Sequence, residues 1–238
     1  MLEILFQDEH YIIINKPAGM LVHRTKLAKH DVAEFAMQLL RDQLGQWVYP
    51  LHRIDRPTSG VLIFAKSSEA ASAFETQFSE KKIKKYYLAL VRGFFTEEKV
   101  YLDYPLKKEE SQEMQEAQTT FWKMAHFEVP LPSSPKHPTS RYSLVKAFPH
   151  TGRTHQIRRH LGHLRNYIVG DTSHGDNKQN KFFRSQFDLH KLMLHAWQVE
   201  FFHPFTEELI KAEAPLPEYF ADILEKLRNP ELLELPCD

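Results

Sequence analysis

Cysteine is almost absent from this chain. Its single cysteine, Cys237, lies one residue from the C-terminus, so neither an internal disulfide framework nor a cysteine metal cluster can form. No apolar run approaches the roughly 20 residues that a membrane-spanning helix requires. Residues 1–8 also lack the basic start and apolar core of a signal peptide. We therefore expect a reducing, cytoplasmic setting and no membrane partner.

Glycine-rich phosphate loops are missing as well. The chain has only 8 glycines, and Gly152, Gly162 and Gly170 lack the strand–GxGxxG–helix context of a nucleotide-binding motif. No G-x-S-x-G nucleophile motif is present. A nucleotide-cofactor domain is therefore not expected.

Net charge gives no direct sign of function, because the 31 basic and 31 acidic residues cancel. The charges are unevenly distributed, however. Residues 151–191 contain eight basic and three acidic side chains, whereas residues 207–238 contain nine acidic and three basic ones. A locally basic face can bind phosphate even when the total charge is zero. Solvated charge runs are common, so this observation is weak without a motif.

The pattern of apolar runs and turn residues predicts an α+β fold in a single domain over residues 1–238. Strand-like runs outnumber helical patterns and follow one another, which favours a large, mixed, mostly antiparallel sheet with flanking helices. The expected strands are 2–6 and 11–15 as a hairpin, then 61–65, 81–92, 118–128, 139–148, 192–196, 198–202 and 208–212. The expected helices are 31–44, one from Ser67 or Ser68, one from Thr154, and 217–228.

Two details of this pattern concern helix ends and insertions. Asp31 and Glu34 form a capping box at the start of helix 31–44, and Gly45 is its stop. Residues 107–117 and 176–191 are polar and show no clear periodicity. We expect these two segments to be mobile insertions.

The most informative stretch is His52-Arg53-Ile54-Asp55-Arg56-Pro57-Thr58-Ser59-Gly60, directly before the apolar run 61–65. A carboxylate in a loop that enters a core strand is held rigidly, as a catalytic group must be. The flanking guanidinium groups of Arg53 and Arg56 are expected to keep Asp55 ionised and to lower its pKa. The alternative is an ordinary surface loop with an Asp–Arg pair.

A second patch runs from Thr151 to His160. On a helical wheel Arg158 lies beside the apolar positions Ile157 and Leu161, so its guanidinium can reach inward to a carboxylate. Asp55 is the expected partner. The residues leave open the alternative that Arg158 extends to solvent, with its stem covering the helix face.

A third patch is the strand with Lys85, Tyr87, Ala89 and Val91 on one face. Tyr87 could stack on a base and offer its hydroxyl for proton transfer, or it could be an ordinary core tyrosine. A zinc site is not expected, although the chain has 14 histidines, because no cysteine or H-E-x-x-H pattern supports it.

Taken together, these stretches resemble the RluA-type pseudouridine synthases, in the order found in that family and over nearly the full chain. Ile54 stands where leucine is more usual, and the family's optional S4 domain is not expected, because the first hairpin starts at residue 2. The blocks that carry the resemblance are Asn15-Lys16-Pro17-Ala18-Gly19 with Val22-His23, the Asp55 stretch, Lys85-x-Tyr87-x-Ala89-x-Val91-x-Gly93, Gly152-Arg153-Thr154-His155-Gln156-Ile157-Arg158-x-His160-Leu161, Gly170-Asp171 with His174-Gly175, and Leu192-x-Leu194-His195-Ala196.

The resemblance implies a pseudouridine synthase fold around a central cleft, with Asp55 as the nucleophile that attacks the ribose or the uracil of the target. Arg158 would pair with Asp55, and Tyr87 would stack on the uracil and assist removal of the C5 proton. Arg53 would help to flip the uridine, at an unstacking cost of a few kcal/mol. Further expected RNA contacts are His52, Lys16, Arg24, Arg56, Arg153, Arg159 and Arg165. Moving the glycosidic bond to C5 requires no metal or redox cofactor, and none is predicted.

Finer matches, such as Asp103-Tyr104-Pro105-Leu106, resemble family members that act on tRNA. We therefore expect a tRNA partner, uridine sixty-five as the target, and a monomeric enzyme. The alternatives are a ribosomal RNA synthase of the same family, a non-catalytic RNA-binding module, and a glycosylase that would release free uracil.

Overall fold

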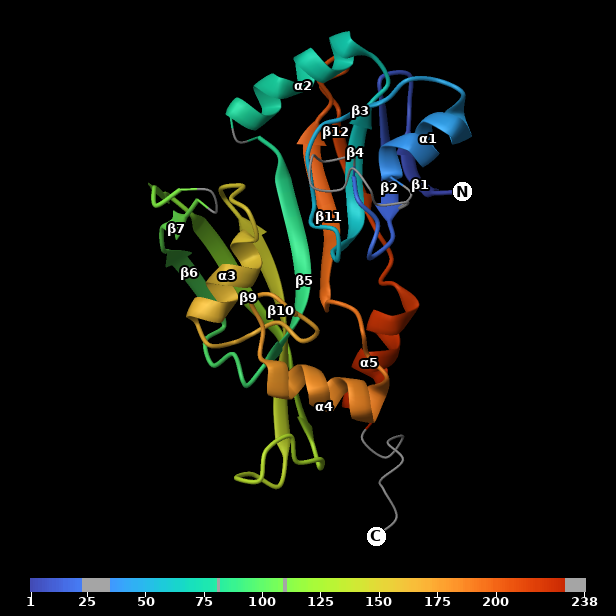
Figure 1. Cartoon of the computed structure of the whole chain (residues 1–238). Helices are drawn as coiled ribbons and strands as arrows, with labels where there is room; N and C mark the ends of the chain where they lie inside the picture. Colours follow the sequence, from blue (N-terminus) through green and yellow to red (C-terminus); the bar gives the residue numbers. More distant parts are fainter. Residues whose placement is uncertain (23–34, 81, 109–110, 230–238) are drawn as a thin grey trace. The chain divides into compact units, whose positions relative to one another are not determined.

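The computed structural model describes residues 1–22, 35–80, 82–108 and 111–229. The chain divides into two compact units (Figure 1). Unit 1 comprises Met1–Tyr87 and His195–Pro215, and unit 2 comprises Leu88–Leu194 and Leu216–Asp238. Each unit is made of segments that are distant along the chain, and the single domain expected from the sequence stays a prediction.

Unit 1 contains the predicted N-terminal hairpin. Strands β1 and β2 pair antiparallel, β2 pairs antiparallel with β4, and β3 adds to β4. β11 runs parallel to β4, with His195 opposite Ser59, and β12 pairs antiparallel with β11. The strands of unit 1 are β1 (Glu3–Gln7), β2 (Tyr11–Lys16), β3 (Tyr49–Pro50), β4 (Ser59–Ala65), the part of β11 (Leu194–Phe202) from His195 onward, and β12 (Leu209–Glu213).

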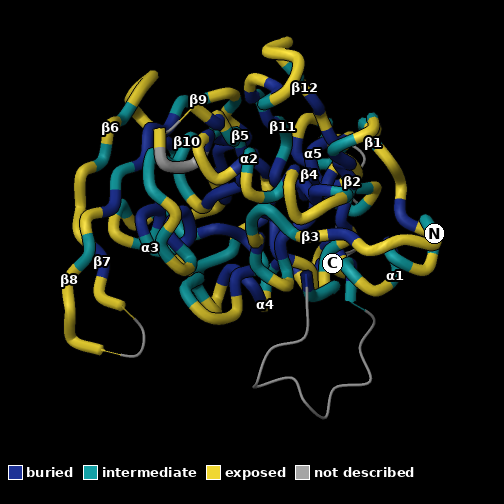
Figure 2. The backbone as a smooth tube through the Cα atoms, turned by 90° about the horizontal axis from the view of Figure 1, so that it is seen from above, coloured by how far each residue is buried: buried dark blue, intermediate teal, exposed yellow. Residues whose placement is uncertain are grey.

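The core of unit 1 explains why β4 is apolar throughout. All residues of β4 are buried, as Figure 2 shows, so the strand reads as a continuous apolar run rather than an alternating one. Tyr11 and Phe74 pack in this core with their ring centroids 5.3 Å apart. The Tyr11 hydroxyl donates a hydrogen bond to the Ala70 carbonyl at 3.0 Å, which satisfies its buried polar atom.

Two helices belong to unit 1. Helix α1 (Ala36–Leu44) buries Ala36 and Leu40 and ends at Gly45, whose φ of 65° confirms the predicted stop. The proposed capping box at Asp31 and Glu34 lies outside the described residues. Helix α2 (Ser68–Ser79) follows the Ser67 hydroxyl, which accepts the Ala70 N–H and so confirms the predicted start.

Unit 2 is an antiparallel sheet with a separate small hairpin. β9 pairs with β10 along most of its length and with β6 on its other side, which confirms the two long predicted strands. The strands of unit 2 are the part of β5 (Lys84–Arg92) from Leu88 onward, β6 (Lys99–Asp103), β7 (Leu106–Lys107), β8 (Met114–Gln115), β9 (Gln118–Val129) and β10 (Ser140–Pro149). Within the described chain the pairing is mixed and mostly antiparallel, so the expected fold class is confirmed.

Three helices complete unit 2. Helix α3 (Gln156–His163) lies beside β10 (Figure 1), and helix α5 (Glu218–Arg228) begins after Pro217 as predicted. Helix α4 (Asn177–Phe187) occupies the segment that was expected to be a polar insertion. It buries Phe183 and Phe187 and is capped by the Asp176 carboxylate.

Two other expectations differ from the structure. Residues 107–117 contain part of the β7–β8 hairpin, which is mostly exposed (Figure 2), and they end at the buried Ala117. Residues 192–202 form one strand from Leu194 rather than two, because Trp197 continues the extended backbone. None of the described helices is long and apolar enough to cross a membrane.

Candidate functional site

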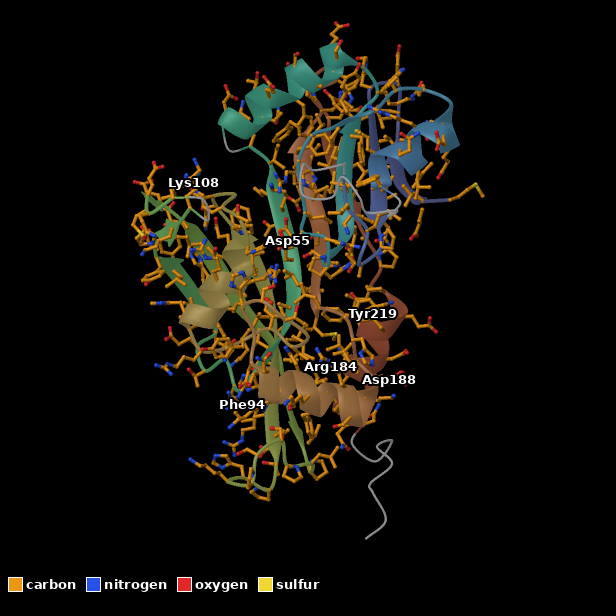
Figure 3. The ribbon with its side chains drawn as sticks, viewed as in Figure 1. Asp55, Phe94, Lys108, Arg184, Asp188 and Tyr219 are labelled. Carbon is orange, nitrogen blue, oxygen red and sulfur yellow. The ribbon has the colours of Figure 1, made fainter. Side chains whose placement is uncertain are left out.

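Asp55 lies in unit 1, in the loop that joins β3 to β4 (Figure 3). The loop turns back at Asp55, whose carbonyl accepts the Thr58 N–H at 3.0 Å. Asp55 itself is half-buried, whereas Arg53 and Arg56 are exposed and Thr58 is buried. The carboxylate thus sits where a solvent-accessible loop enters the most buried strand of the unit.

The segment after β2 braces this loop from the other side. The buried Lys16 ammonium donates to the carbonyls of Pro17 at 2.9 Å, Met20 at 2.8 Å and Arg56 at 3.3 Å. Gly19 donates its N–H to the Arg56 carbonyl at 2.8 Å, and the Arg56 Nε donates to the Gly19 carbonyl at 3.0 Å. Three of these contacts, all at Arg56, join two segments that are about forty residues apart in sequence.

Lys16 corrects one expectation from the sequence. Its side chain is fully buried, so its ammonium group points into the fold and does not face RNA phosphates. Burial lowers the pKa of Lys16 to about 7, an effect that the nearby charge of Asp55 partly opposes. We assign Lys16 to the bracing of the Asp55 loop.

The start of β4 is anchored to β11. The Ser59 hydroxyl lies 2.8 Å from Nδ1 of His195, and Nε2 of His195 lies 3.1 Å from the Ala214 carbonyl. Because a carbonyl can only accept, Nε2 carries the proton and Nδ1 accepts from Ser59. Burial lowers the pKa of His195 to about 4, in agreement with this neutral tautomer.

Gly60 allows the backbones to approach at the same point. Its φ is +108°, and a Cβ atom there would lie 2.1 Å from the Ala196 carbonyl oxygen. Any side chain would clash with backbone and adopt a strained conformation. Gly60 is therefore required for the parallel contact between β4 and β11 that follows the Asp55 loop.

His52 has a structural contact with β4. Its Nε2 accepts the Ile63 N–H at 3.2 Å, which ties the first part of the Asp55 loop to β4. Burial and the nearby charge of Lys85 lower the pKa of His52 to about 3, so the ring is neutral at physiological pH. The expected contact between His52 and RNA stays a prediction.

Tyr87 lies close to Asp55 within unit 1. Burial, reinforced by the negative charge of Asp55, raises the pKa of Tyr87 above its usual range. The phenol is therefore protonated at neutral pH. Its ring is available for stacking and its hydroxyl for donating a hydrogen bond, whereas a phenolate base is disfavoured.

Arg158 lies in unit 2 and is buried, which excludes the alternative that it extends to solvent. Its Nε donates to Oδ2 of Asp171 at 2.7 Å and its Nη2 donates to Oδ1 at 2.8 Å. This is a two-bond pair of the kind that fixes both the position and the orientation of a guanidinium. Sequence reasoning missed Asp171 as a partner, although Asp171 follows Gly170 in one of the blocks quoted for the family resemblance.

Helix α3 is itself fixed to β9 by a chain of hydrogen bonds. Nε2 of Gln156 donates to the Thr119 hydroxyl at 2.9 Å, and that hydroxyl lies 2.9 Å from Nδ1 of His160. Nε2 of His160 lies 3.0 Å from the Tyr104 carbonyl, so Nε2 carries the proton and Nδ1 accepts. These buried contacts hold the helix that carries Arg158.

The arginines expected to contact phosphate take several different positions. Nε of Arg153 donates to the Glu116 carbonyl at 2.8 Å, and Nη1 of Arg159 donates to the Lys107 carbonyl at 2.9 Å. Both side chains thus hold backbone near the two ends of the β7–β8 hairpin against the start of α3. Arg165 is exposed at a φ of 60°, and Arg24 lies outside the described residues.

Among the described residues, no group of three or more His, Cys, Asp or Glu side chains is arranged to hold a metal ion.

Comparisons with known proteins agree with these features. A family model described as RNA pseudouridylate synthase matches residues 10–163. Two solved human structures, RNA pseudouridylate synthase domain containing 1 and domain containing 4, share the fold with a TM-score of 0.71 each. They are 23% and 24% identical and cover 96% and 99% of this chain and 95% of each of theirs. The chain belongs to the RNA pseudouridylate synthase family, a family of isomerases, as the resemblance to the RluA type predicted.

Its curated relatives carry a more specific name. The tRNA pseudouridine synthase C of Vibrio parahaemolyticus serotype O3:K6 (strain RIMD 2210633) is 51% identical over 98% of this chain and 97% of its own length. The tRNA pseudouridine synthase C of Haemophilus influenzae (strain ATCC 51907 / DSM 11121 / KW20 / Rd) is 46% identical over 94% of this chain and 97% of its own length.

Proposed function

We propose that this chain isomerises a specific uridine to pseudouridine in tRNA, with uridine sixty-five as the target. The observation that carries the proposal is the near full-length similarity to proteins named tRNA pseudouridine synthase C, at 51% and 46% identity. Members of this family share the isomerisation chemistry but differ in their RNA targets. The relatives therefore support the tRNA substrate, and the site residues support the reaction.

In this proposal Asp55 is the nucleophile. Its carboxylate attacks the ribose or the uracil of the flipped uridine, the N1–C1′ bond breaks, the base turns, and C5 bonds to C1′. The C5 proton is lost and N1 gains one, so the reaction is a net isomerisation. The bracing by Lys16, Gly19 and Arg56 supports this role, because a nucleophile must be held in one geometry.

Tyr87, Arg53 and Arg158 have the supporting roles. Tyr87 stacks on the uracil, and its raised pKa keeps the hydroxyl protonated. Arg53 is exposed beside Asp55 in sequence and helps to hold the uridine out of its stem. The pairing of Arg158 with Asp55 stays a prediction, which follows from the family resemblance.

Deletion of the gene for this chain tests the substrate. Pseudouridines are mapped in tRNA and in ribosomal RNA of the deletion strain and its parent. We expect one position in tRNA to lose pseudouridine and to regain it when the gene is restored. Loss at a ribosomal RNA position instead would assign the enzyme to the alternative target, and no loss in either RNA would contradict the proposal.

A further inference from the structure

Several buried contacts hold the Arg158 side chain in place, and the fold alone does not explain why they are needed. Arg158 and Asp171 are both almost completely buried, with 4% and 2% of their surfaces exposed. Burying a charged pair costs desolvation energy, and such pairs are often no more stabilising than apolar side chains of similar volume. Stability alone therefore does not explain why the Arg158–Asp171 pair is buried.

Asp171 is held more firmly than an ordinary partner. Besides the two bonds from Arg158, its Oδ1 accepts the Ser173 N–H at 3.0 Å and the His174 N–H at 2.9 Å. Burial opposes the ionisation of Asp171, but these bonds outweigh burial and hold the pKa of Asp171 below its usual range. The carboxylate is thus ionised in its pair with Arg158, and two backbone N–H groups hold it in addition.

The backbone of Asp171 is fixed as well. Nδ2 of Asn180 on α4 donates to the Asp171 carbonyl at 2.7 Å, and Oδ1 of Asn180 accepts the Gly170 N–H at 2.9 Å. A Cβ at Gly175 would lie 2.2 Å from the Asp171 carbonyl oxygen, so only glycine allows the loop to close over it. Helix α4 therefore holds the loop that carries Asp171.

The geometry of the pair explains what this support achieves. Asp171 binds the guanidinium along its Nε–Nη2 edge, which fixes the plane of the group and hence the direction of Nη1. Because α3 is anchored to β9 through Gln156 and Thr119, the other end of the side chain is fixed too. The Arg158 side chain is therefore held at both ends.

We propose that Asp171 is a positioning residue for the isomerisation, which acts by aiming the Arg158 guanidinium, and that Asn180 secures it from α4. This inference rests on the proposed function. Asp171 touches no reacting atom in this account. Its effect therefore passes through Arg158 and appears in the rate of the chemical step rather than in RNA binding.

A double-mutant cycle on the full chain tests this inference. We measure kcat and KM with tRNA for wild type, Asp171→Asn, Arg158→Lys and the double variant. We expect Asp171→Asn to lower kcat at least about tenfold and to change KM less than about threefold. In the Arg158→Lys background, Asp171→Asn should cause less than about a twofold further loss, because residues that act through one another are not additive.

Two further variants separate positioning from stability. Asp171→Glu keeps the negative charge but displaces the carboxylate by one methylene, so we expect kcat to fall although Arg158 keeps a charged partner. If Asp171→Asn does not fold, Asp171→Glu still tests the proposal. Asp176→Asn is the matched control: it breaks the ion pair with Arg92 at the start of α4, keeps the cap, and should leave kcat unchanged.

The outcomes are distinct. Normal kcat in Asp171→Glu or Asp171→Asn, losses that multiply with Arg158→Lys, or a change confined to KM would overturn the positioning role while the proposed function stands. A wild-type chain that forms no pseudouridine in RNA would instead overturn the proposed function, and this inference with it.

Discussion

The Ser59 hydroxyl donates to Nδ1 of His195 across the parallel pair of β4 and β11, and this contact requires a neutral imidazole. Two strands that are far apart in sequence are thereby joined beside the loop that carries Asp55. The Asp55 loop and the core of unit 1 are therefore linked at this point.

We expect the stability of the protein to fall as the pH drops below about 6.5. The pKa of His195 is about 4 in the fold and 6.5 in the unfolded chain, so the unfolded state binds more protons between these values. The contribution is complete above the unfolded pKa and should lose about 2 kcal/mol by about pH 5. Urea unfolding at about pH 7.5 and about pH 5 measures this change in the free energy of unfolding. His195→Gln should show a smaller loss between the two pH values, and an equal loss would contradict the assignment.

Gly60→Ala should destabilise the protein by at least about 2 kcal/mol, because the new Cβ would meet the Ala196 carbonyl oxygen and the backbone would be strained. Thermal unfolding gives the change. Gly152→Ala is the matched control, since a Cβ there meets nothing within 4 Å and the backbone is not strained. Equal melting temperatures for the two variants would show that the close approach is not as described.

Lys16 and Arg165 should differ in the salt dependence of tRNA binding. Each phosphate contact contributes a slope of about one to the fall of log affinity with log salt. Arg165→Ala should reduce the slope by about that amount, because Arg165 is exposed. Lys16→Met should leave the slope unchanged and lower the stability instead, because the ammonium donates to three carbonyls inside the fold. A reduced slope in Lys16→Met would show that Lys16 contacts RNA phosphate.

Arg159→Ala should loosen the β7–β8 hairpin, since the Arg159 guanidinium holds the Lys107 carbonyl. Hydrogen exchange of residues 106–108 and 111–115 should become faster, while that of β9 and β10 should not. Arg184→Ala on the exposed face of α4 (Figure 3) is the control and should leave exchange at the hairpin unchanged. Unaltered exchange in Arg159→Ala would mean that the hairpin is held by other contacts.

The sequence predicted the elements whose burial follows a simple period. Strand β2, the apolar strand β4 and helix α5 all have apolar residues where the fold buries them. Helix α4 was missed because two of its buried residues, Gln179 and Asn180, are polar. Asn180 is buried because it hydrogen-bonds the backbone around Asp171, and a contact of this kind leaves no periodic signal.

The sequence predicted which residues form the candidate site, but it did not predict most of the contacts that they make. The Asp55 stretch, Tyr87 and Arg158 stand out by motif. Lys16 was expected at the surface because a charged side chain suggests exposure. Lys16 and His52 both bind backbone groups, and such contacts have no sequence signature. Asp171 was visible in its motif, but its distance from Arg158 is set by the fold.

Asp55→Asn tests the central claim most directly. The variant keeps the size of the side chain and removes the nucleophilic carboxylate, so tRNA should bind within about threefold of the wild-type affinity while the chemical step is lost. Release of tritium from C5-labelled uridine in tRNA is measured in parallel with wild type. We predict no release above background for Asp55→Asn. Turnover at the wild-type rate would contradict the assignment of Asp55 as the nucleophile.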